Sequence, residues 1–318
     1  MSSENFIRGL ESRDYSLVRK SAKSDLHNHG ILGGKLAMLE AWVGKALPKQ
    51  PEIIEEFSQF DAYLFSLLDV AFAHGEPKGI AGLEFLFAAA FAQAKEDSVK
   101  VLEMSVDSGF NRFYPGGAKE LSVRLDAIHK SIAPEMNFIP ELGIARDREL
   151  AEAEEMAEDF ISSGYFKAID LYGTESAKDA KLFKNIFTKA KNAGMKLKSH
   201  AGEYGDAESI RYTAETLELD AIQHGIRAAE SKEVMSWLRE NKIVLNVCPT
   251  SNVILQRAES IKKHQIRALF DAGIKVTVNS DDIMVFNQTV SDEFITLYNN
   301  GVFTAKELDE IRRNGLGE

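Results

Sequence analysis

The sequence predicts an α/β protein: a single (β/α)8 barrel of the TIM type that spans residues 1–318, with extra helices after its first strand and at its C-terminus. Eight short β-branched or apolar runs, each followed by a polar or glycine-containing turn, alternate with helix-period segments, an order typical of parallel strands. A length of 318 residues suits one such barrel. The chain contains no low-complexity tract, Pro/Ser-rich linker or block of like charge that would mark a domain boundary.

The eight expected strands follow one another along the chain. They are KSDLHNH (23–29), SVKVLEMSV (98–106), MNFIPELGI (136–144), FKAIDLYG (166–173), MKLKSHAGE (195–203), DAIQHG (220–225), KIVLNVCP (242–249) and IKVTVNSDD (274–282). Segments such as 148–163 and 178–194 have the helical period, and a glycine such as Gly194 ends a helix at low cost. An open doubly wound sheet is the structural alternative, but it usually carries an early glycine-rich phosphate turn, which this chain lacks.

The charge and the cysteine content narrow the class of partner. Lys and Arg total 38 against 49 Asp and Glu, a net charge of −11, so we expect a small-molecule partner rather than nucleic acid or an anionic membrane. Cys248 is the single cysteine and cannot form an internal disulfide, and the N-terminus lacks a signal-peptide layout, so we expect a cytoplasmic protein. The apolar run FLFAAAFA (85–92) is too short to span a bilayer and predicts a buried helix or a subunit contact, which leaves a homo-oligomer open.

Two histidines stand two residues apart in the first expected strand. Alternate side chains of a strand share a face, so His27 and His29 point into one space and Asn28 points away. Two imidazoles that converge at the mouth of a barrel supply two corners of a metal site, since zinc and related metals are commonly held by histidine nitrogens and a carboxylate. Taken alone, the pair is equally typical of two hydrogen-bonded structural histidines.

Further titratable residues stand at other strand ends. His200 and His224 end the fifth and sixth expected strands, and Asp281 and Asp282 end the eighth. Active sites of (β/α)8 barrels gather at the carboxyl ends of the strands, so these positions favour a metal site over two structural histidines. The histidines in helical or loop contexts, for which we expect ordinary surface or packing roles, are His74, His129 and His264.

The segments DLHNH, SHAGE, QHG, CPTSN and NSDD, in this order and at these strand ends, resemble the metal-dependent adenosine deaminase family of the amidohydrolase superfamily, which includes the AMP and adenine deaminases. The resemblance spans nearly the whole chain. It implies a zinc-dependent hydrolytic deaminase that releases ammonia from an adenine-type purine and gives the 6-oxopurine. It also implies one Zn²⁺, or another divalent transition metal, bound by a set of four residues. These are His27, His29, His200 and Asp281.

The resemblance also implies roles for the residues around the metal. A metal lowers the pKa of a bound water from ~16 towards ~7, so it supplies a hydroxide at neutral pH. As a hypothesis, His224 and Asp281 take the proton of this water and orient it, and a protonated Glu203 gives a proton to ring N1. Asp282 would bond the N7 edge of the purine. The amide of Gly173 would contact N3, although a plain turn glycine is the alternative.

The chain departs from the family pattern in two places. Adenosine deaminases usually continue the HxH motif with Leu-Asp-Gly, whose aspartate lies near the ribose 5′-hydroxyl, but Gly30, Ile31 and Leu32 follow His29 here. In the loop after the fourth strand, Tyr172 stands where the family tends to have alanine. These changes leave the metal-centred chemistry intact. Adenosine, a modified nucleoside, a nucleotide and free adenine all remain open as the substrate.

Two other functional classes are compatible with parts of the sequence. A metal phosphoesterase can also begin with a DLHxH strand, but it builds a multi-metal cluster and usually closes with Asp-x-His, which this chain lacks. A silent purine-binding barrel would have lost a ligand or the acid, and all are present here. Cys248 has no paired base motif and is expected to pack or to support the ligands. The aromatic segment 109–117 is either a closing loop or a plain βα loop.

Overall fold

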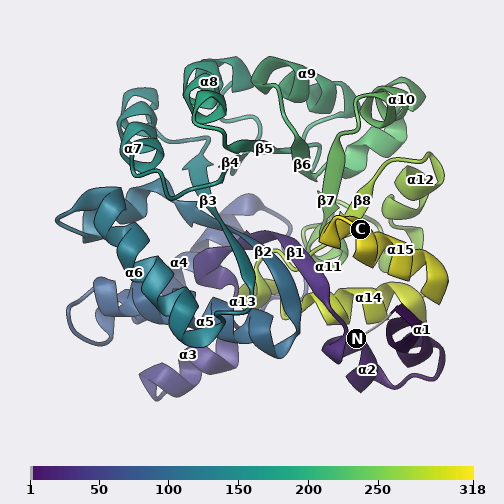
Figure 1. The fold of residues 1–318 in the computed structure, drawn as a ribbon, viewed down its shortest axis with the longest axis horizontal. Coiled ribbons are helices and arrows are strands. Elements are labelled where there is room, and N and C mark those ends of the chain that lie inside the picture. Colours follow the sequence, from purple (N-terminus) through teal and green to yellow (C-terminus); the bar gives the residue numbers. More distant parts are fainter. Residues whose placement is uncertain (1–2) are drawn as a thin grey trace.

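The computed structural model describes residues 3–318, and at its centre lies a sheet of eight parallel strands in the order β1 to β8 (Figure 1). The strands are β1 (Lys23–His29), β2 (Val99–Asp107), β3 (Asn137–Ala145), β4 (Ala168–Tyr172), β5 (Lys196–Ala201), β6 (Ala221–His224), β7 (Val244–Val247) and β8 (Val276–Val278). Each strand pairs in parallel with the next one in the sequence. Because every strand lies within one residue of an expected run, the predicted (β/α)8 barrel is confirmed.

Helices connect the strands and surround the sheet in Figure 1. They are α1 (Ser3–Glu11), α2 (Tyr15–Lys20), α3 (Leu36–Val43), α4 (Phe57–Ala73), α5 (Ile80–Glu96), α6 (Gly117–Ile132), α7 (Leu150–Ser162), α8 (Lys184–Asn192), α9 (Ala207–Leu217), α10 (Lys232–Glu240), α11 (Pro249–Ile254), α12 (Ile266–Asp271), α13 (Ile283–Phe286), α14 (Val290–Asn299) and α15 (Ala305–Leu316). Short 3₁₀ segments are η1 (Gly30–Leu32), η2 (Ser108–Phe113), η3 (Ala180–Phe183), η4 (Ile226–Glu230) and η5 (Ile261–Lys263). The extra helices expected after the first strand are α3 to α5, and those expected at the C-terminus are α13 to α15.

The apolar run 85–92 lies inside α5, where Phe87 and Phe91 are buried, so the expected buried helix is confirmed. No helix within residues 3–318 is both long and apolar enough to cross a membrane. The aromatic segment that follows β2 forms η2. Phe110 of this segment packs against Phe87 of α5, with ring centroids 6.2 Å apart.

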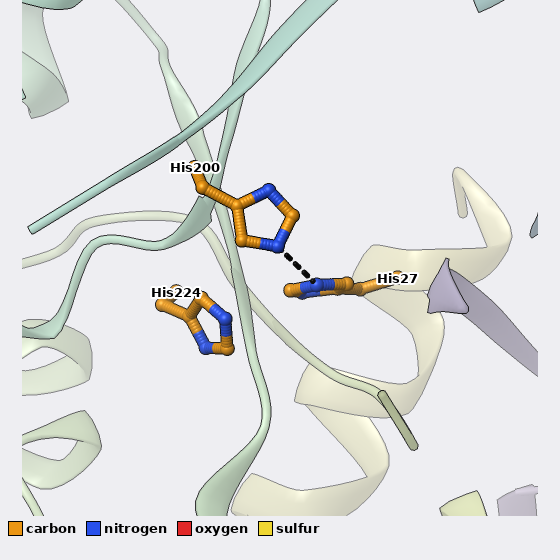
Figure 2. Close-up of side chains that lie close together, drawn as sticks. All are labelled: His27, His200 and His224. Atoms are coloured by element: carbon orange, nitrogen blue, oxygen red, sulfur yellow. Dashed lines mark hydrogen bonds between the residues drawn. The ribbon is translucent and has the colours of Figure 1, made fainter. Parts of the chain in front are cut away.

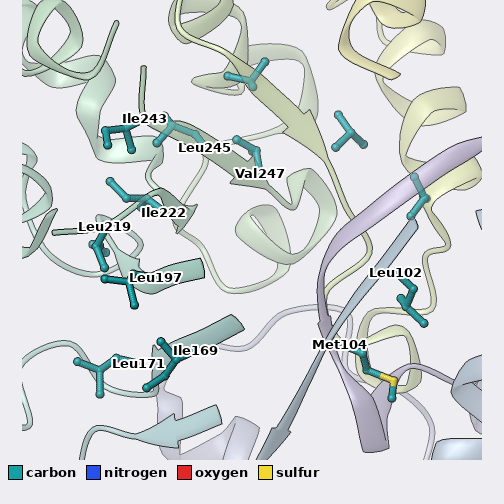
Figure 3. Close-up of a cluster of buried hydrophobic side chains, with 14 of the residues drawn as sticks. Leu102, Met104, Ile169, Leu171, Leu197, Leu219, Ile222, Ile243, Leu245 and Val247 are labelled. Atoms are coloured by element: carbon teal, nitrogen blue, oxygen red, sulfur yellow. The ribbon is translucent and has the colours of Figure 1, made fainter. Parts of the chain in front are cut away.

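The outward-facing residues of the strands form the core between the barrel and its helices (Figure 3). They include Leu102, Met104, Ile169, Leu171, Leu197, Ile222, Leu245 and Val247, all buried. Removing one such side chain typically costs about 2–5 kcal/mol, because the surrounding residues fill the cavity only partly. Successive strand side chains alternate in direction, so the residues between these aliphatic ones face the barrel interior.

The interior of the barrel below the site is polar and paired. The ammonium of Lys198 donates to the carbonyl oxygen of Leu26 at 2.8 Å and to Glu103 at 2.8 Å, and it lies 2.5 Å from the carboxylate of Glu141. A buried charge is costly unless it is paired and hydrogen-bonded, and Lys198 meets both conditions. Paired, buried charges therefore fill the barrel directly below the strand ends that carry the site.

The seam between β8 and β1 is closed just beyond the end of β8. The N–H of Asp281 donates to the carbonyl oxygen of His27 at 3.0 Å, and Asn28 and Asp281 form a parallel bridge. Below this point the side chain of Asn279 accepts the N–H of Leu26 at 2.8 Å. The barrel is thus nearly closed, and Asp281 lies on the line where its first and last strands meet.

Candidate metal centre and active site

The imidazoles expected to bind a metal converge at the carboxyl ends of the strands. Nε2 of His27 lies 3.1 Å from Nε2 of His200, and Figure 2 shows this contact between the two rings with His224 beside them. Oδ1 of Asp281 lies 3.8 Å from Nε2 of His27 and 3.6 Å from Nε2 of His29. Ligand atoms around a tetrahedral zinc at ~2.1 Å lie about 3.4 Å apart. The structure therefore brings the candidate ligands together in two overlapping groups that share His27, and within each group all ligand atoms lie within 4.8 Å of one another. One group is His27, His29 and Asp281, and the other is His27, His200 and His224.

The hydrogen-bond partners of two of these imidazoles show that the donor set fits a cation. Nδ1 of His27 lies 3.3 Å from the carbonyl oxygen of Asn246, and Nδ1 of His200 lies 3.3 Å from Oδ1 of Asp170. Each Nδ1 therefore carries the proton and donates it, and each Nε2 presents a lone pair. Two imidazole nitrogens 3.1 Å apart need a proton or a metal cation between them. The residues present thus fit a divalent metal.

Burial sets the protonation of the candidate ligands. It lowers the pKa of His27 well below its usual value and that of His29 to about 3, so both rings are neutral and available as ligands. Burial also acts on His200, but the Asp170 carboxylate outweighs it and raises the pKa of His200. Burial raises the pKa of Asp281 to about 6, although Ser251 donates a hydrogen bond to Oδ2 at 2.6 Å. A bound cation would favour the ionised carboxylate of Asp281.

Glu203 lies on a turn that another carboxylate holds in place. The side chain of Glu175 accepts the N–H groups of Gly202, Glu203 and Tyr204 at 2.9, 2.9 and 2.7 Å. Gly202 has φ of +69°, and a Cβ there would lie 2.2 Å from the side chain of Ile210, so the turn requires glycine. The sequence analysis did not single out Glu175. Its position two residues after Gly173, close to the end of a strand, could have indicated a role in the site.

The carboxyl group of Glu203 is buried beside His224. Its Oε2 lies 3.6 Å from Nε2 of His224, and its Oε1 is buried without a hydrogen-bond partner. Burial, supported by the negative charge of Asp281, raises the pKa of Glu203 to about 8. Glu203 is therefore a neutral acid at pH values below about 8, with one oxygen free to meet a ligand.

Left-handed backbone conformations aim two of the site residues. Gln223 points into the barrel, where its side chain bonds Asn246, so strand alternation alone would turn His224 outward. With φ of +63°, His224 turns back towards the site, and Asp281 has φ of +60°. Such conformations cost of order 1–3 kcal/mol for residues other than glycine and persist where the surroundings enforce them.

The two candidate substrate-binding residues lie at the same rim. Asp282 is buried, its Oδ1 has no hydrogen-bond partner, and burial together with the charge of Asp281 raises its pKa well above the usual value. Gly173 follows β4 with φ of +91°, a conformation that glycine adopts readily. A Cβ at Gly173 would meet only the backbone nitrogen of Arg146, at 3.8 Å, so the backbone angle rather than crowding requires glycine.

The CPTSN segment contributes more than the sequence indicated. Cys248 is buried with Sγ 3.3 Å from Nδ1 of His27, so it packs behind a candidate ligand, in line with the expected packing role. Ser251 bonds Asp281, and the side-chain amide of Asn252 lies 3.1 Å from Nδ1 of His224. Sequence reasoning missed both Ser251 and Asn252. His264, for which a surface or packing role was expected, is buried, and its Nε2 lies 3.3 Å from Oδ1 of Asn252.

Comparison with known proteins adds an independent line of evidence. The family model described as adenosine deaminase matches residues 83–318. A relative in Treponema pallidum, named for adenosine/adenine deamination, is 33% identical over 295 residues, covering 93% of this chain and 96% of the relative. An adenosine deaminase of Clostridium acetobutylicum is 39% identical over 149 residues, which is 47% of this chain and 45% of that protein.

Solved structures share the fold. The adenine deaminase of Arthrobacter aurescens superposes with a TM-score of 0.78 at 24% identity, covering 94% of this chain and 93% of that one. An amidohydrolase from Burkholderia ambifaria with bound Zn gives a TM-score of 0.79 at 18% identity, with coverage of 95% and 86%. By its match to the family model and to the Treponema relative, this chain belongs to the adenosine/adenine deaminase family and is a hydrolytic deaminase.

Proposed function

We propose that this chain is a zinc-dependent deaminase that replaces the 6-amino group of an adenine-type purine with oxygen. The observation that carries the proposal is the close approach of Nε2 of His27 and Nε2 of His200, 3.1 Å apart, at the strand ends where the carboxyl group of Glu203 is buried. The reaction consumes one water and releases one ammonia. His27, His29, His200 and Asp281 would hold one Zn²⁺, which lowers the pKa of a water from ~16 towards ~7 when bound.

The chain's own residues account for the remaining steps. Glu203 is held neutral and has an unpaired Oε1, so it can give a proton to ring N1 and make C6 open to attack by water. N7 of a purine is an acceptor, and Asp282 is held protonated with an unpaired oxygen, so it can donate to N7. The N–H of Gly173 would meet N3. Asp281 and His224 would face the attacking water.

A screen of ammonia release tests the proposed function. We expect turnover with at least one compound among adenine, adenosine, its 5′-phosphate and N6-methylated forms, and about one zinc per chain by elemental analysis. Two or three metal ions per chain together with phosphoester hydrolysis would indicate a phosphoesterase instead. A chain that binds purines without metal or turnover would be a catalytically inactive purine-binding protein. This result, like phosphoester hydrolysis with several metal ions, would contradict the proposal.

The position of Tyr172 favours free adenine over adenosine as the substrate. Its ring meets the ring of His29 at an edge, with centroids 5.5 Å apart, and its hydroxyl donates to Asp107, which pairs with Arg148 at 3.2 Å. The ring also covers Gly143, where a Cβ would lie 2.9 Å from Cε1 of Tyr172. In the family, a ribose extends towards the residues after the second histidine of HxH. A fixed ring beside His29 narrows that space.

Replacing this ring should shift the preference between the two substrates. We expect Tyr172→Ala to raise the ratio of kcat/KM for adenosine to that for adenine by about 10- to 100-fold, because the space for a sugar opens. Tyr172→Phe keeps the ring and should leave the ratio within a few-fold of wild type. Initial rates of ammonia release measure both. A wild-type enzyme that prefers adenosine would contradict the assignment.

A further inference from the structure

His264 lies outside the site described so far, yet hydrogen bonds connect it to that site. It follows η5, only 2% of its surface is exposed, and it lies between α11 and α12 in the sequence. Burial lowers the pKa of His264 to about 3, so its ring is neutral and carries one proton. Which of its two nitrogens holds that proton is decided by its neighbours.

A backbone amide fixes the proton on His264. The N–H of Ile266 donates to Nδ1 of His264 at 3.1 Å. A backbone N–H can only donate, so Nδ1 is the acceptor and the proton sits on Nε2. Nε2 lies 3.3 Å from Oδ1 of Asn252, which accepts it.

The side chain of Asn252 fixes the position of the proton on His224 in the same way. With Oδ1 engaged by His264, the NH₂ group of Asn252 is the one that lies 3.1 Å from Nδ1 of His224. An amide NH₂ only donates, so Nδ1 of His224 accepts and its proton sits on Nε2. A flipped Asn252 would press its NH₂ against the N–H of His264, and a proton on Nδ1 of His224 would face the same NH₂. This series of hydrogen bonds thus disfavours both the Nδ1–H tautomer and the imidazolium form of His224.

We propose that His264 and Asn252 are positioning residues that hold His224 as the Nε2–H tautomer, so that His224 acts in the reaction as a hydrogen-bond donor. This proposal deepens the proposed function and rests on it. Nε2 of His224 lies 3.6 Å from Oε2 of Glu203 and 3.9 Å from Oδ2 of Asp281, so the N–H is directed at the centre of the site. Because this nitrogen is already protonated, it cannot accept a proton from the water.

The division of labour between His224 and Asp281 follows. Water attacks C6, forming the C6–O bond, and its proton passes to Asp281, whose carboxylate is the remaining acceptor beside the water. The N–H of His224 stabilises the negative charge that develops on the attacking oxygen. The C6–N bond then breaks as Asp281 returns this proton to the amino group, which leaves as ammonia. The hydroxyl on C6 gives its hydrogen to the Glu203 carboxylate left after N1 was protonated, so that one water and the aminopurine give one 6-oxopurine and one ammonia.

Nuclear magnetic resonance reads the tautomer directly. Two-bond ¹H–¹⁵N correlation spectra of the full chain, labelled at histidine and recorded zinc-free and zinc-loaded at neutral pH, distinguish a proton on Nδ1 from one on Nε2. The signals that vanish in His224→Gln belong to His224. We expect the Nε2–H pattern for both His224 and His264. An Nδ1–H or doubly protonated His224 would overturn the proposal, and because this measurement needs no turnover, it is independent of whether an aminopurine is the substrate.

Steady-state kinetics test how the hydrogen bonds from His264 through Asn252 to His224 affect turnover. In His264→Phe, the amide of Asn252 is free to flip and to stabilise the other tautomer of His224, so we expect kcat to fall about 10- to 100-fold with KM within about two-fold. In His264→Gln, the amide can still donate to Asn252, and kcat should recover to within a few-fold of wild type. His129→Phe, on the outer helix α6, is the matched control. Equal loss in His264→Phe and His264→Gln with an unchanged His224 tautomer would refute a positioning role.

Discussion

Glu203→Gln is expected to lose ammonia release by about 10²- to 10⁴-fold while it keeps its fold and its bound metal. Glutamine is close in size and can form a hydrogen bond to ring N1, but it cannot transfer a proton to it. Without that transfer, negative charge accumulates on the ring when water attacks C6. Turnover of the substrate found in the screen, measured by ammonia release, tests the expectation, and elemental analysis of the same sample reports the metal.

The structure explains why this substitution isolates the chemistry. The turn that carries Glu203 is held through backbone N–H groups by Glu175, and these bonds survive a change of the Glu203 side chain. The side chain itself leaves Oε1 unpaired, so little structure depends on it. Glu215→Gln, on the exposed pair with Arg211, is a matched control that should keep full activity. Turnover in Glu203→Gln within ten-fold of wild type would remove Glu203 as the proton donor.

His200→Ala is expected to abolish metal binding and, with it, activity. The change removes one of the two facing Nε2 donors and leaves the buried Asp170 carboxylate without its imidazole partner. We expect the metal content to fall from about one per chain to near zero and kcat/KM to fall at least about 10³-fold. The wild-type melting temperature should rise with added zinc, since a ligand at about 1,000 times its Kd stabilises the folded state by about 4 kcal/mol.

Two comparisons separate metal loss from misfolding. His129→Ala removes a histidine from the outer helix α6 and should retain metal and activity. Circular dichroism of His200→Ala at a temperature well below its melting point should match the wild type. If His200→Ala keeps about one zinc per chain, His200 is not a ligand and the four-residue site is wrong.

The fold could be predicted from the sequence because it follows from short-range periodicity, and the candidate metal ligands were expected from their places at strand ends and from the resemblance to the deaminase family. Alternation in β1 places His27 and His29 on one face, and the parallel order of the strands brings their carboxyl ends to one rim. His200 and Asp281 stand at such ends, so their convergence required no knowledge of loop geometry. In the structure Nε2 of His27 lies 3.1 Å from His200 and 3.8 Å from Asp281, and Nε2 of His29 lies 3.6 Å from Asp281.

The supporting contacts could not be predicted in this way. The bond from Asn252 to His224 depends on the left-handed turn at His224, which reverses the direction that alternation would give its side chain. Glu175, in the loop after β4, accepts three backbone N–H groups that follow β5. Sequence periodicity does not predict such a contact between two loops. His264 looked like a packing residue because its role lies in which nitrogen carries a proton. Such roles emerge only from partners that are placed in three dimensions.

The seam of the barrel has a consequence for how a bound ion affects local stability. Asp281 follows the last strand, and His27 lies in the first strand. The backbone contact between them closes the barrel, and their side chains are two of the proposed metal ligands. An ion bound by both residues would add a cross-link between the first and the last strand. Its removal should therefore lower the free energy of local opening of the barrel at this point.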